Sequence, residues 1–434
     1  MGLFMDLFFI VLGWIALLQS ILALLATVRF VRYCSGRQLS QSSRHRLKAV
    51  IIIPCKGLED GIEENLRALL LQDYPHYEII FVTESKKDPA YALISRMIKQ
   101  SKQNKPAAWL LVAGEATNRG QKVHNLAAAI EMLNSLNRSA EVLVFADSDA
   151  RVTRRWLRDL IAPLQEDDLR IGATTGYRWY LPMRGGFHSL LLSVWNSSAL
   201  SLLGERSSFA WGGGMAIKRE NFEALEILSR WKGALSDDYT LSAAVKKAGK
   251  RIMFIPQCLA VTFADMTLAQ LIEFTSRQMR ITRVYSPPVW KLALLTHGLY
   301  NLAFWGGLIW LVVNALLGKN NSNLFYILLG VFIVGAISGA IRALAVANFI
   351  QTEQRATKIP LGAYTLLGPV VSLVYLINII LSAATTRITW RGIGYQMISP
   401  GETLTISRPL PESSTKAASR KRKKRKTSVQ SSSQ

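Results

Sequence analysis

Between Leu47 and about Gly176, short apolar runs alternate with segments whose apolar residues recur every three or four positions. The short runs predict buried strands, and the three-to-four spacing predicts amphipathic helices. The expected strands are Ala49–Ile53, Glu78–Val82, Trp109–Val112 and Val142–Ala146, and the expected helices are Ile62–Gln72, a helix from Asp88-Pro89 to about Ser101, and Gln121–Leu133. This alternation indicates an α/β fold, Rossmann-like, with a mostly parallel sheet covered by helices on both faces.

Four much longer apolar runs flank this region, and each is long enough to span a bilayer. They are Leu3–Val28 at the N-terminus, then Leu292–Leu317, Leu324–Ile350 and Leu361–Ala384. A cleaved signal peptide would also explain the first run. However, that run has no basic residues before it and exceeds the usual length of a signal peptide's apolar core, which favours a retained anchor. The chain is therefore expected to be an integral membrane protein with transmembrane helices at both ends.

The formal net charge of +23 is concentrated next to these apolar runs. Basic residues follow the first run, and a second basic cluster lies near the C-terminus; these are Arg29, Arg32, Arg37, Arg44, Arg46 and Lys48, and then Arg420–Lys426. The positive-inside rule places both clusters in the cytosol. Anionic lipid headgroups are the expected partners of such clusters beside membrane helices, in preference to nucleic acid. The three cysteines lack metal or redox spacing, as suits a reducing compartment.

Four regions follow from these patterns: an anchor at 1–28, a cytosolic domain at 47–285, a membrane region at 290–385, and a cytosolic basic tail at 386–434 that is disordered from about 411. The topology contains a conflict, because four spans place the tail opposite the cytosolic domain while its basic residues require the cytosol. One apolar run is therefore expected to be re-entrant or interfacial. Leu324–Ile350 is the candidate, since Arg342 interrupts it.

Candidate chemistry begins where the strand Val142–Ala146 ends, at Asp147 and Asp149. Ligands bind at the carboxyl edge of parallel strands, and two carboxylates there can hold Mg²⁺ or Mn²⁺ against a diphosphate; a polar turn before the next helix is the alternative interpretation. Pro54 and Glu84 follow two other strands and are expected at the same edge. Glu84 would accept hydrogen bonds from a base or ribose, unless it is a solvated loop acid. The first strand lacks a glycine-rich phosphate fingerprint, which argues against nicotinamide, flavin and P-loop enzymes.

The pattern changes after Gly176. Phe187–Leu203 is apolar but short, which predicts an interfacial or active-site helix. In the segment Trp211–Arg219, three glycines would let a ligand approach the backbone, or would only form a tight turn. Ser236 or Asp237 is placed to cap a helix. Arginines at helical spacing before the membrane form a basic face; they are Arg277, Arg280 and Arg283.

As a set, these motifs resemble the inverting nucleotide-sugar glycosyltransferases of family two, and most closely the ceramide glucosyltransferase-like membrane enzymes. The segments that carry the resemblance are Pro54–Gly57, Glu84 where the family usually has aspartate, Asp147-Ser148-Asp149, Gly212–Arg219, Asp237-Asp238-Tyr239 and Arg277-Gln278-Met279-Arg280, in this order over about residues 47–285. The resemblance implies a GT-A glycosyltransferase domain. It also implies that the enzyme moves one hexose, expected to be glucose, from a UDP-sugar to the hydroxyl of a membrane lipid with inversion.

The resemblance assigns roles to individual residues. Asp238 would be the catalytic base, and Asp149, assisted by Asp147, would bind the metal. The nucleotide-sugar would be bound by Pro54, Lys56, Glu84, Lys122, Asp147, Gly213, Gly214, Arg277 and Arg280, with uracil between the Pro54 loop and Glu84.

Two departures from the family pattern bear on the acceptor. Ile281 stands where processive synthases have tryptophan, which argues against a polymerase. There is no histidine between Leu203 and Trp211, which leaves ceramide-like, sterol-like, hopanoid and diacylglycerol acceptors open. A processive polysaccharide synthase and an inactive, membrane-anchored nucleotide-sugar-binding homologue are the alternative functions.

Overall fold

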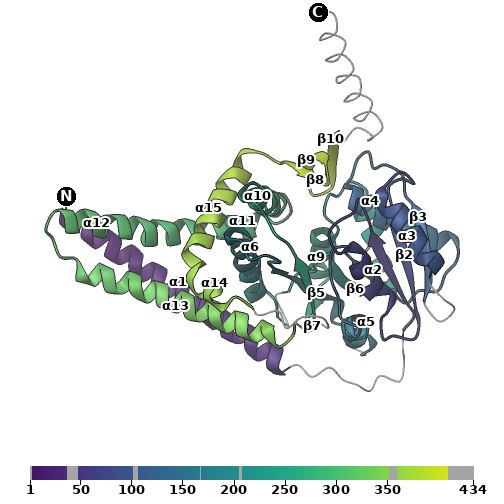
Figure 1. Ribbon diagram of the computed structural model, residues 1–434, viewed down its shortest axis with the longest axis horizontal. Helices are drawn as coiled ribbons and strands as arrows, with labels where there is room; N and C mark the ends of the chain where they lie inside the picture. Colours follow the sequence, from purple (N-terminus) through teal and green to yellow (C-terminus); the bar gives the residue numbers. More distant parts are fainter. Residues whose placement is uncertain are drawn as a thin grey trace, which may run out of the picture.

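The structure is a computed structural model that describes residues 2–36, 47–100, 106–166, 168–204, 208–350 and 359–408. An α/β domain lies beside a bundle of long helices, and the N-terminus is at the far end of that bundle (Figure 1). Some predictions fall outside the described residues. They are the basic residues Arg37, Arg44 and Arg46, the run Arg420–Lys426, and the disorder expected from about residue 411.

The α/β domain contains a seven-stranded sheet of order β3-β2-β1-β4-β6-β5-β7. The strands are β1 (Ala49–Pro54), β2 (Tyr77–Thr83), β3 (Ala107–Val112), β4 (Val142–Ala146), β5 (Ile171–Leu181), β6 (Gly214–Lys218) and β7 (Arg251–Phe263). The first four are mutually parallel, β5 pairs in parallel with β7, and β6 runs antiparallel to β4 and β5. The predicted mostly parallel α/β fold is therefore confirmed. The carboxyl ends of β1, β2 and β4 lie at one edge.

Helices cover both faces of this sheet because successive strand residues point to opposite sides. Ile51 and Ile53 of β1 pack against α2 (Ile62–Leu70), α3 (Pro89–Gln100) and α5 (Trp156–Ile161), which continues into η1 (Ala162–Gln165). Ile52 faces the other layer, made by α4 (Gln121–Ser135), α7 (Arg219–Ala224), α8 (Ile227–Arg230) and α9 (Asp237–Lys247). Asp88 caps α3 by accepting a 2.9 Å hydrogen bond from the Ala90 amide, as the Asp-Pro pair predicted.

Three helical stretches are long and apolar enough to cross a membrane among the described residues. They are α1 (Gly2–Gly36), the continuous run formed by α11 (Pro287–Asn301), η3 (Leu302–Gly306) and α12 (Gly307–Leu316), and α13 (Ser322–Ala347). The first and last pack closely, and Thr27 of α1 shares a 2.9 Å hydrogen bond with Ser338 of α13. Asp6, the lone charge of the first apolar run, accepts hydrogen bonds from Trp310, Asn314 and Asn321.

The prediction that Leu324–Ile350 is the re-entrant segment is wrong. This segment contains α13, one unbroken 26-residue helix, and Arg342 lies near its C-terminal end. There the guanidinium donates a 3.2 Å hydrogen bond to the carbonyl of Ser197 beside the α/β domain, so Arg342 does not interrupt the middle of a span. The broken segment is Leu361–Ala384. It forms the short α14 (Leu361–Leu366) and the 17-residue α15 (Gly368–Ala384), which packs on α10 (Leu268–Tyr285) and α11.

A layer of short helices joins the α/β domain to the long ones. The predicted helix at Phe187–Leu203 is α6 (Phe187–Ser197) followed by the 3₁₀ turn η2 (Ser198–Leu202). Both lie between β5 and the helices that follow α13. Ser198 shares a 2.6 Å hydrogen bond with Tyr375 of α15, and Ser276 of α10 donates one of 2.9 Å to Asn378. These polar contacts fix the membrane helices against the domain.

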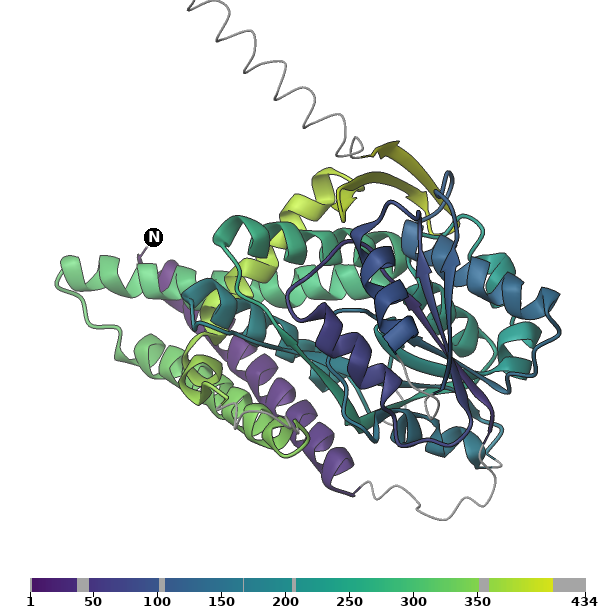
Figure 2. The same ribbon diagram turned by 45° about the vertical axis from the view of Figure 1, so that its right-hand side comes forward.

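The first part of the region predicted to be a basic tail is folded. After α15 the chain forms a three-stranded antiparallel sheet of β8 (Arg387–Trp390), β9 (Ile393–Ser399) and β10 (Glu402–Ser407), with β9 in the centre. We call it the C-terminal sheet. It lies against the α/β domain (Figure 2). Its buried side chains pack with Leu235 and with Ile281 of α10. The sequence analysis named no strands here, because they are short and alternate polar with apolar residues, which is a weak pattern.

Candidate active site

A single cavity of about 1680 Å³ runs from the carboxyl edge of the sheet to the membrane helices. Residues of the α/β domain line one part, among them Asp147, Asp149 and Asp238. Side chains of α1, α11 and α13 line another, including Gln19 and His297. The cavity therefore connects the predicted catalytic carboxylates with the helices that are long enough to span a membrane.

Asp147 and Asp149, at the end of β4, both form salt bridges with one arginine side chain, which was not predicted. Nη2 of Arg178, in β5, lies 2.8 Å from Asp147 Oδ2 and 2.7 Å from Asp149 Oδ1. Lys122 Nζ lies 2.9 Å from the other oxygen of Asp147. Burial alone would raise the pKa of Asp147, but the charges of Lys122 and Arg178 outweigh it and hold that pKa below its usual value. Asp147 is thus held in its charged form, and Arg178 fixes both carboxylates at the strand end.

This pair of carboxylates fits a divalent cation. Mg²⁺ is typically held by one or two carboxylates, and substrate phosphates and water complete its coordination shell. Two aspartates at a strand end are therefore enough protein ligands. Asp149 and Asp147 would hold the ion, and it would supply positive charge to the diphosphate of a bound nucleotide. The described residues include no group of three or more His, Cys, Asp or Glu side chains able to hold a metal without a substrate.

Lys122, at the start of α4, lies at the centre of the site. Besides Asp147, its ammonium group lies 3.3 Å from Asp237 Oδ2 and donates a 3.1 Å hydrogen bond to the carbonyl of Gly212. Burial would lower the pKa of Lys122, but the carboxylates of Asp147 and Asp237 raise it above its usual value. Asp237 is almost fully buried, and burial raises its pKa to about 6. Lys122 therefore ties the metal-site carboxylates to the start of α9.

Asp238 has the surroundings expected of a base. Of the two predicted caps, Ser236 is the N-cap of α9, and its hydroxyl accepts a hydrogen bond from the Tyr239 amide. Asp238 Oδ1 accepts hydrogen bonds from the Ser236 hydroxyl and the Tyr239 amide, and Oδ2 accepts one of 3.1 Å from the Gly212 amide. Unlike its neighbour Asp237, Asp238 is only half-buried, and it lines the cavity. Its carboxylate is oriented and remains accessible.

The glycine segment passes close to both groups. A side chain at Gly213 would lie 2.2 Å from the Trp211 ring and 2.6 Å from Asp147 Oδ2. Gly213 lines the cavity, whereas Gly214 opens β6 against the same tryptophan. Close approach of backbone and side chains therefore requires glycine at these positions, beyond the simple turn that the sequence also allowed.

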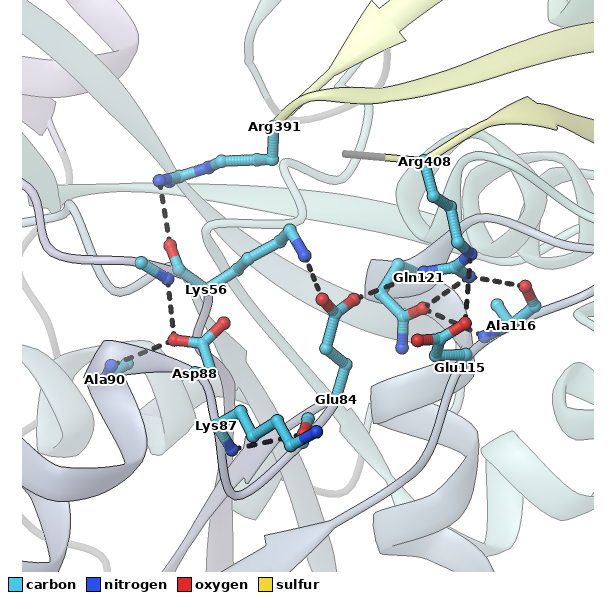
Figure 3. Close-up of polar contacts among 12 residues, drawn as sticks. Lys56, Glu84, Lys87, Asp88, Ala90, Glu115, Ala116, Gln121, Arg391 and Arg408 are labelled. Atoms are coloured by element: carbon cyan, nitrogen blue, oxygen red, sulfur yellow. Dashed lines mark hydrogen bonds and ion pairs between the residues drawn. The ribbon is translucent and has the colours of Figure 1, made fainter. Parts of the chain in front are cut away.

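The loop after β1 and the end of β2 form the part of the sheet edge where the nucleotide-sugar donor is expected. We call it the donor edge. Pro54 and Lys56 line the cavity. Lys56 Nζ contacts Glu84 Oε1, and Glu84 Oε2 lies 3.5 Å from Arg408, which follows β10 (Figure 3). Glu84 lies behind Lys56 and is not itself among the residues that line the cavity. The predicted edge thus exists, and the C-terminal sheet covers it.

The three arginines of α10 do not act as one basic face. Arg277 lines the cavity, and its guanidinium lies 5.2 Å from the ring centre of Phe274 and 5.7 Å from that of Trp390. Burial lowers its pKa. Arg280 does not line the cavity. Arg283 donates hydrogen bonds of 2.7 and 2.8 Å to the last carbonyls of α15 and so holds a helix C-terminus.

Four charged residues at the site were not predicted: Arg178, Glu59, Arg391 and Arg408. Arg178 had a signal, because it is the lone charge inside the aromatic strand segment Tyr177–Tyr180. A charged side chain in a buried strand requires a partner of opposite charge. The other three depend on contacts between the C-terminal sheet and distant loops, for which the sequence offers no spacing rule.

Comparison with known proteins gives one family and several distant structures. The family described as "Glycosyl transferase family 21" matches residues 11–403. The chain is 16% identical to a mannosyltransferase from Pyrobaculum calidifontis solved with GDP-Man and Mn²⁺, with a TM-score of 0.46 over 87% of this chain and 98% of the other. The chain is also 16% identical to glucosyl-3-phosphoglycerate synthase from Mycobacterium tuberculosis, solved with Mn²⁺ and UDP-Glc. The TM-score is 0.34, over 55% of this chain and 78% of the other.

Proposed function

The chain belongs to glycosyl transferase family 21, and on this premise we propose that it moves one hexose from a UDP-sugar to the hydroxyl of a membrane lipid, with inversion. The family number corrects the sequence analysis, which named family two, while the likeness to ceramide glucosyltransferase-like enzymes stands. Membership makes the chain a glycosyltransferase that uses a nucleotide sugar. The sugar, the base, the lipid and the stereochemistry belong to the proposal.

The cavity that joins Asp238 to the membrane helices is the observation that carries the lipid acceptor. Its membrane part is lined by polar groups as well as apolar ones; the polar ones are Gln19, Thr27, Thr296, His297, Ser338 and Arg342. Polar side chains on membrane helices are costly and mark a path for a polar group. They would contact a lipid headgroup while its acyl chains remain among α1, α11 and α13. A water-soluble acceptor would need no such lining.

The proposed reaction is a single displacement. Asp238 accepts the proton of the lipid hydroxyl as the hydroxyl oxygen forms a bond to the anomeric carbon. The bond between that carbon and the diphosphate oxygen breaks on the opposite face, which inverts the configuration and releases UDP. Lys122 and Arg277 face the cavity and would stabilise the charge of the leaving diphosphate. Mg²⁺ or Mn²⁺ on Asp149 and Asp147 would add further positive charge there.

Membrane sidedness follows from the basic residues. With α1, the α11–α12 run and α13 as spans, both ends of the α/β domain lie on one side, together with the C-terminal sheet. The positive-inside rule makes that side the cytosol, and the catalytic domain would therefore act on the cytosolic leaflet. This arrangement removes the conflict that four spans created, because α15, with 17 residues, is shorter than the roughly 20 residues of a typical span.

The test is to incubate purified protein with labelled UDP-sugars and a total membrane lipid extract, and to analyse the organic phase. One new glycolipid with a single sugar is expected, and its mass identifies the acceptor. Asp238→Asn should lower turnover at least about a hundredfold while UDP binding is retained, because only the proton acceptor is lost. Glu220→Gln, an exposed acid on α7, is the matched control. Label confined to a water-soluble product would contradict the proposal.

A polysaccharide synthase is the second candidate, and one contact bears on it. The sequence analysis argued against a polymerase because Ile281 replaces a tryptophan, yet Trp390 of β8 lines the cavity beside Arg277. An aromatic ring is thus supplied from another element. The size of the product in the same assay decides between the two, since a polymerase would give a ladder of long water-soluble chains.

A further inference from the structure

The tip of the β8–β9 hairpin carries an arginine in an unfavourable backbone conformation. Arg391 has φ 52° and Gly392 has φ 78°, so both residues of this two-residue turn are left-handed. Asn, Asp and Gly are the residues that such turns favour, because other side chains cost free energy there. Arginine at this position therefore calls for a compensating role.

The Arg391 side chain lies in the cavity. Its Nη1 contacts Glu59 Oε1 at 2.5 Å and donates a 3.2 Å hydrogen bond to the carbonyl of Lys56, in the loop that follows β1. Burial would lower its pKa, but the charges of Glu59, Asp149 and Asp147 raise it above its usual value. The guanidinium is thus held close to the two aspartates that would carry the metal.

Arg391 is also one of the least neutralised cations of the site. Arg178 is shared by two aspartates, and Lys122 is likewise placed between two. Among the described residues, Arg391 has one carboxylate in salt-bridge contact, Glu59. The positive charge of Arg391 is therefore less neutralised than that of Arg178 or Lys122 and could attract a diphosphate. A guanidinium group can also form bidentate hydrogen bonds with two phosphate oxygens.

The C-terminal sheet is held over the donor edge by a second arginine. Arg408 Nη2 donates hydrogen bonds of 2.5 Å to the carbonyl of Ala116 and 3.0 Å to Gln121 Oε1, and Nη1 lies 3.5 Å from Glu84 (Figure 3). Tyr395 of β9 accepts a 3.1 Å hydrogen bond from the Gln121 amide. These contacts tie the sheet to the start of α4 and to the end of β2.

We propose that Arg391 binds the diphosphate of the nucleotide-sugar donor, and that Arg408 is a positioning residue that holds the C-terminal sheet so that Arg391 reaches it. The proposal rests on the proposed function, because it requires a nucleoside-diphosphate donor. It assigns to the donor site a segment that lies beyond the last membrane helix, more than 200 residues after the metal-site aspartates.

The first experiment compares UDP with uridine as ligands of purified full-length protein. Arg391→Gln should weaken UDP binding roughly tenfold to a hundredfold, as expected for a lost charge-assisted hydrogen bond, and should leave uridine binding unchanged. Arg391→Lys should restore part of the loss. Arg387→Gln removes an exposed arginine from the same sheet and should bind both ligands as the natural protein does. Equal losses for UDP and uridine, or no loss, would overturn the assignment.

The second experiment separates positioning from direct binding by a double-mutant cycle. Arg408→Gln alone should weaken UDP binding, but it should have little further effect in the Arg391→Gln background, because both substitutions remove the same contact. Thermal unfolding of each variant shows whether it is folded. If the two losses multiply, Arg408 acts on the nucleotide directly and the positioning role is wrong.

Failure of the inference is distinguishable from failure of the proposed function. Natural protein that binds no UDP, with or without Mn²⁺, contradicts the UDP donor itself. Natural protein that binds UDP, together with an Arg391→Gln variant that binds it equally well, contradicts only the role of Arg391.

Discussion

Arg178 and Asp149 form a bidentate ion pair, in which Arg178 Nη2 lies 2.7 Å from Asp149 Oδ1 and Nη1 lies 3.1 Å from Oδ2. The same Nη2 also contacts Asp147. A side chain from β5 therefore neutralises both carboxylates that follow β4. A divalent cation that binds these two acids must share them with this arginine.

Removal of this arginine should increase the response to metal. Among the described residues, Arg178→Gln leaves Asp149 without a salt bridge and Asp147 with Lys122 alone, so we expect the free energy of unfolding to fall by about 3 kcal/mol. Mn²⁺ should then raise the melting temperature of the variant more than that of the natural protein, because the ion replaces the lost charge. Thermal unfolding with and without Mn²⁺ measures both effects. Arg184→Gln, at an exposed arginine, is the control. An equal Mn²⁺ response in both proteins would refute the expectation.

The buried carboxyl of Asp237 should make stability depend on pH. Its pKa is about 6 in the folded chain and about 3.8 for the free side chain, so the folded state binds a proton more tightly. Ionised Asp237 therefore destabilises the fold above pH 6, by about 3 kcal/mol, and this cost disappears below about pH 4. Asp237→Asn removes the charge. Its stability relative to the natural protein should rise as pH increases from 4 to 7.

Melting temperatures of the two proteins across this range provide the measurement. Asp73→Asn changes an exposed aspartate and should show no such trend. A difference between the Asp237→Asn variant and the natural protein that stays constant from pH 4 to 7 would show that Asp237 does not titrate in this window.

Three spans predict opposite sides for two loops. Asn320, between α12 and α13, should lie across the membrane from Glu402, the first residue of β10. Single cysteines at these positions, Asn320→Cys and Glu402→Cys, can be labelled with an impermeant maleimide in sealed vesicles of known orientation. Native Cys34, Cys55 and Cys258 are buried and unpaired, so background labelling should be low. Labelling of both positions from the same side would mean that α13 does not cross.

Gly339 should be needed where α13 meets α14. A side chain there would lie 1.9 Å from the backbone carbonyl of Tyr364, which cannot be relieved by a rotamer change. Gly339→Ala should therefore lower the melting temperature, because the two helices must separate. Gly335 lies one turn earlier with nothing near its missing side chain, and Gly335→Ala should be neutral or slightly stabilising. Equal effects of the two substitutions would argue against the close crossing.

The sheet and its edge were predictable because they depend on local pattern. Buried strands such as Val142–Ala146 are short apolar runs, and the carboxyl ends of parallel strands necessarily meet at one edge. Asp147, Asp149 and Pro54 could therefore be placed together from the sequence. Asp238 followed from the family resemblance alone, and its carboxylate lines the cavity.

The membrane topology was only partly predictable. Hydropathy identifies apolar runs but does not distinguish a span from a broken interfacial pair, and Arg342 misled the choice because its position relative to the α/β domain was unknown. The structure shows that the arginine lies at the end of α13 beside Ser197, and that the break occurs at Leu367, before Gly368 and Pro369. Contacts between helices decide this, and hydropathy does not record them.

The sequence by itself determined the α/β class, the apolar runs and the acids at the strand ends, since each depends on residues close together in the chain. Only the tertiary structure decided which cations face those acids. Arg178, Arg391 and Arg408 reach the site from β5 and from the C-terminal sheet, and Arg408 lies 324 residues from its partner Glu84. A charge pair across that separation has no periodicity to reveal it, because its geometry exists only after the sheet, the membrane helices and the C-terminal sheet have packed together.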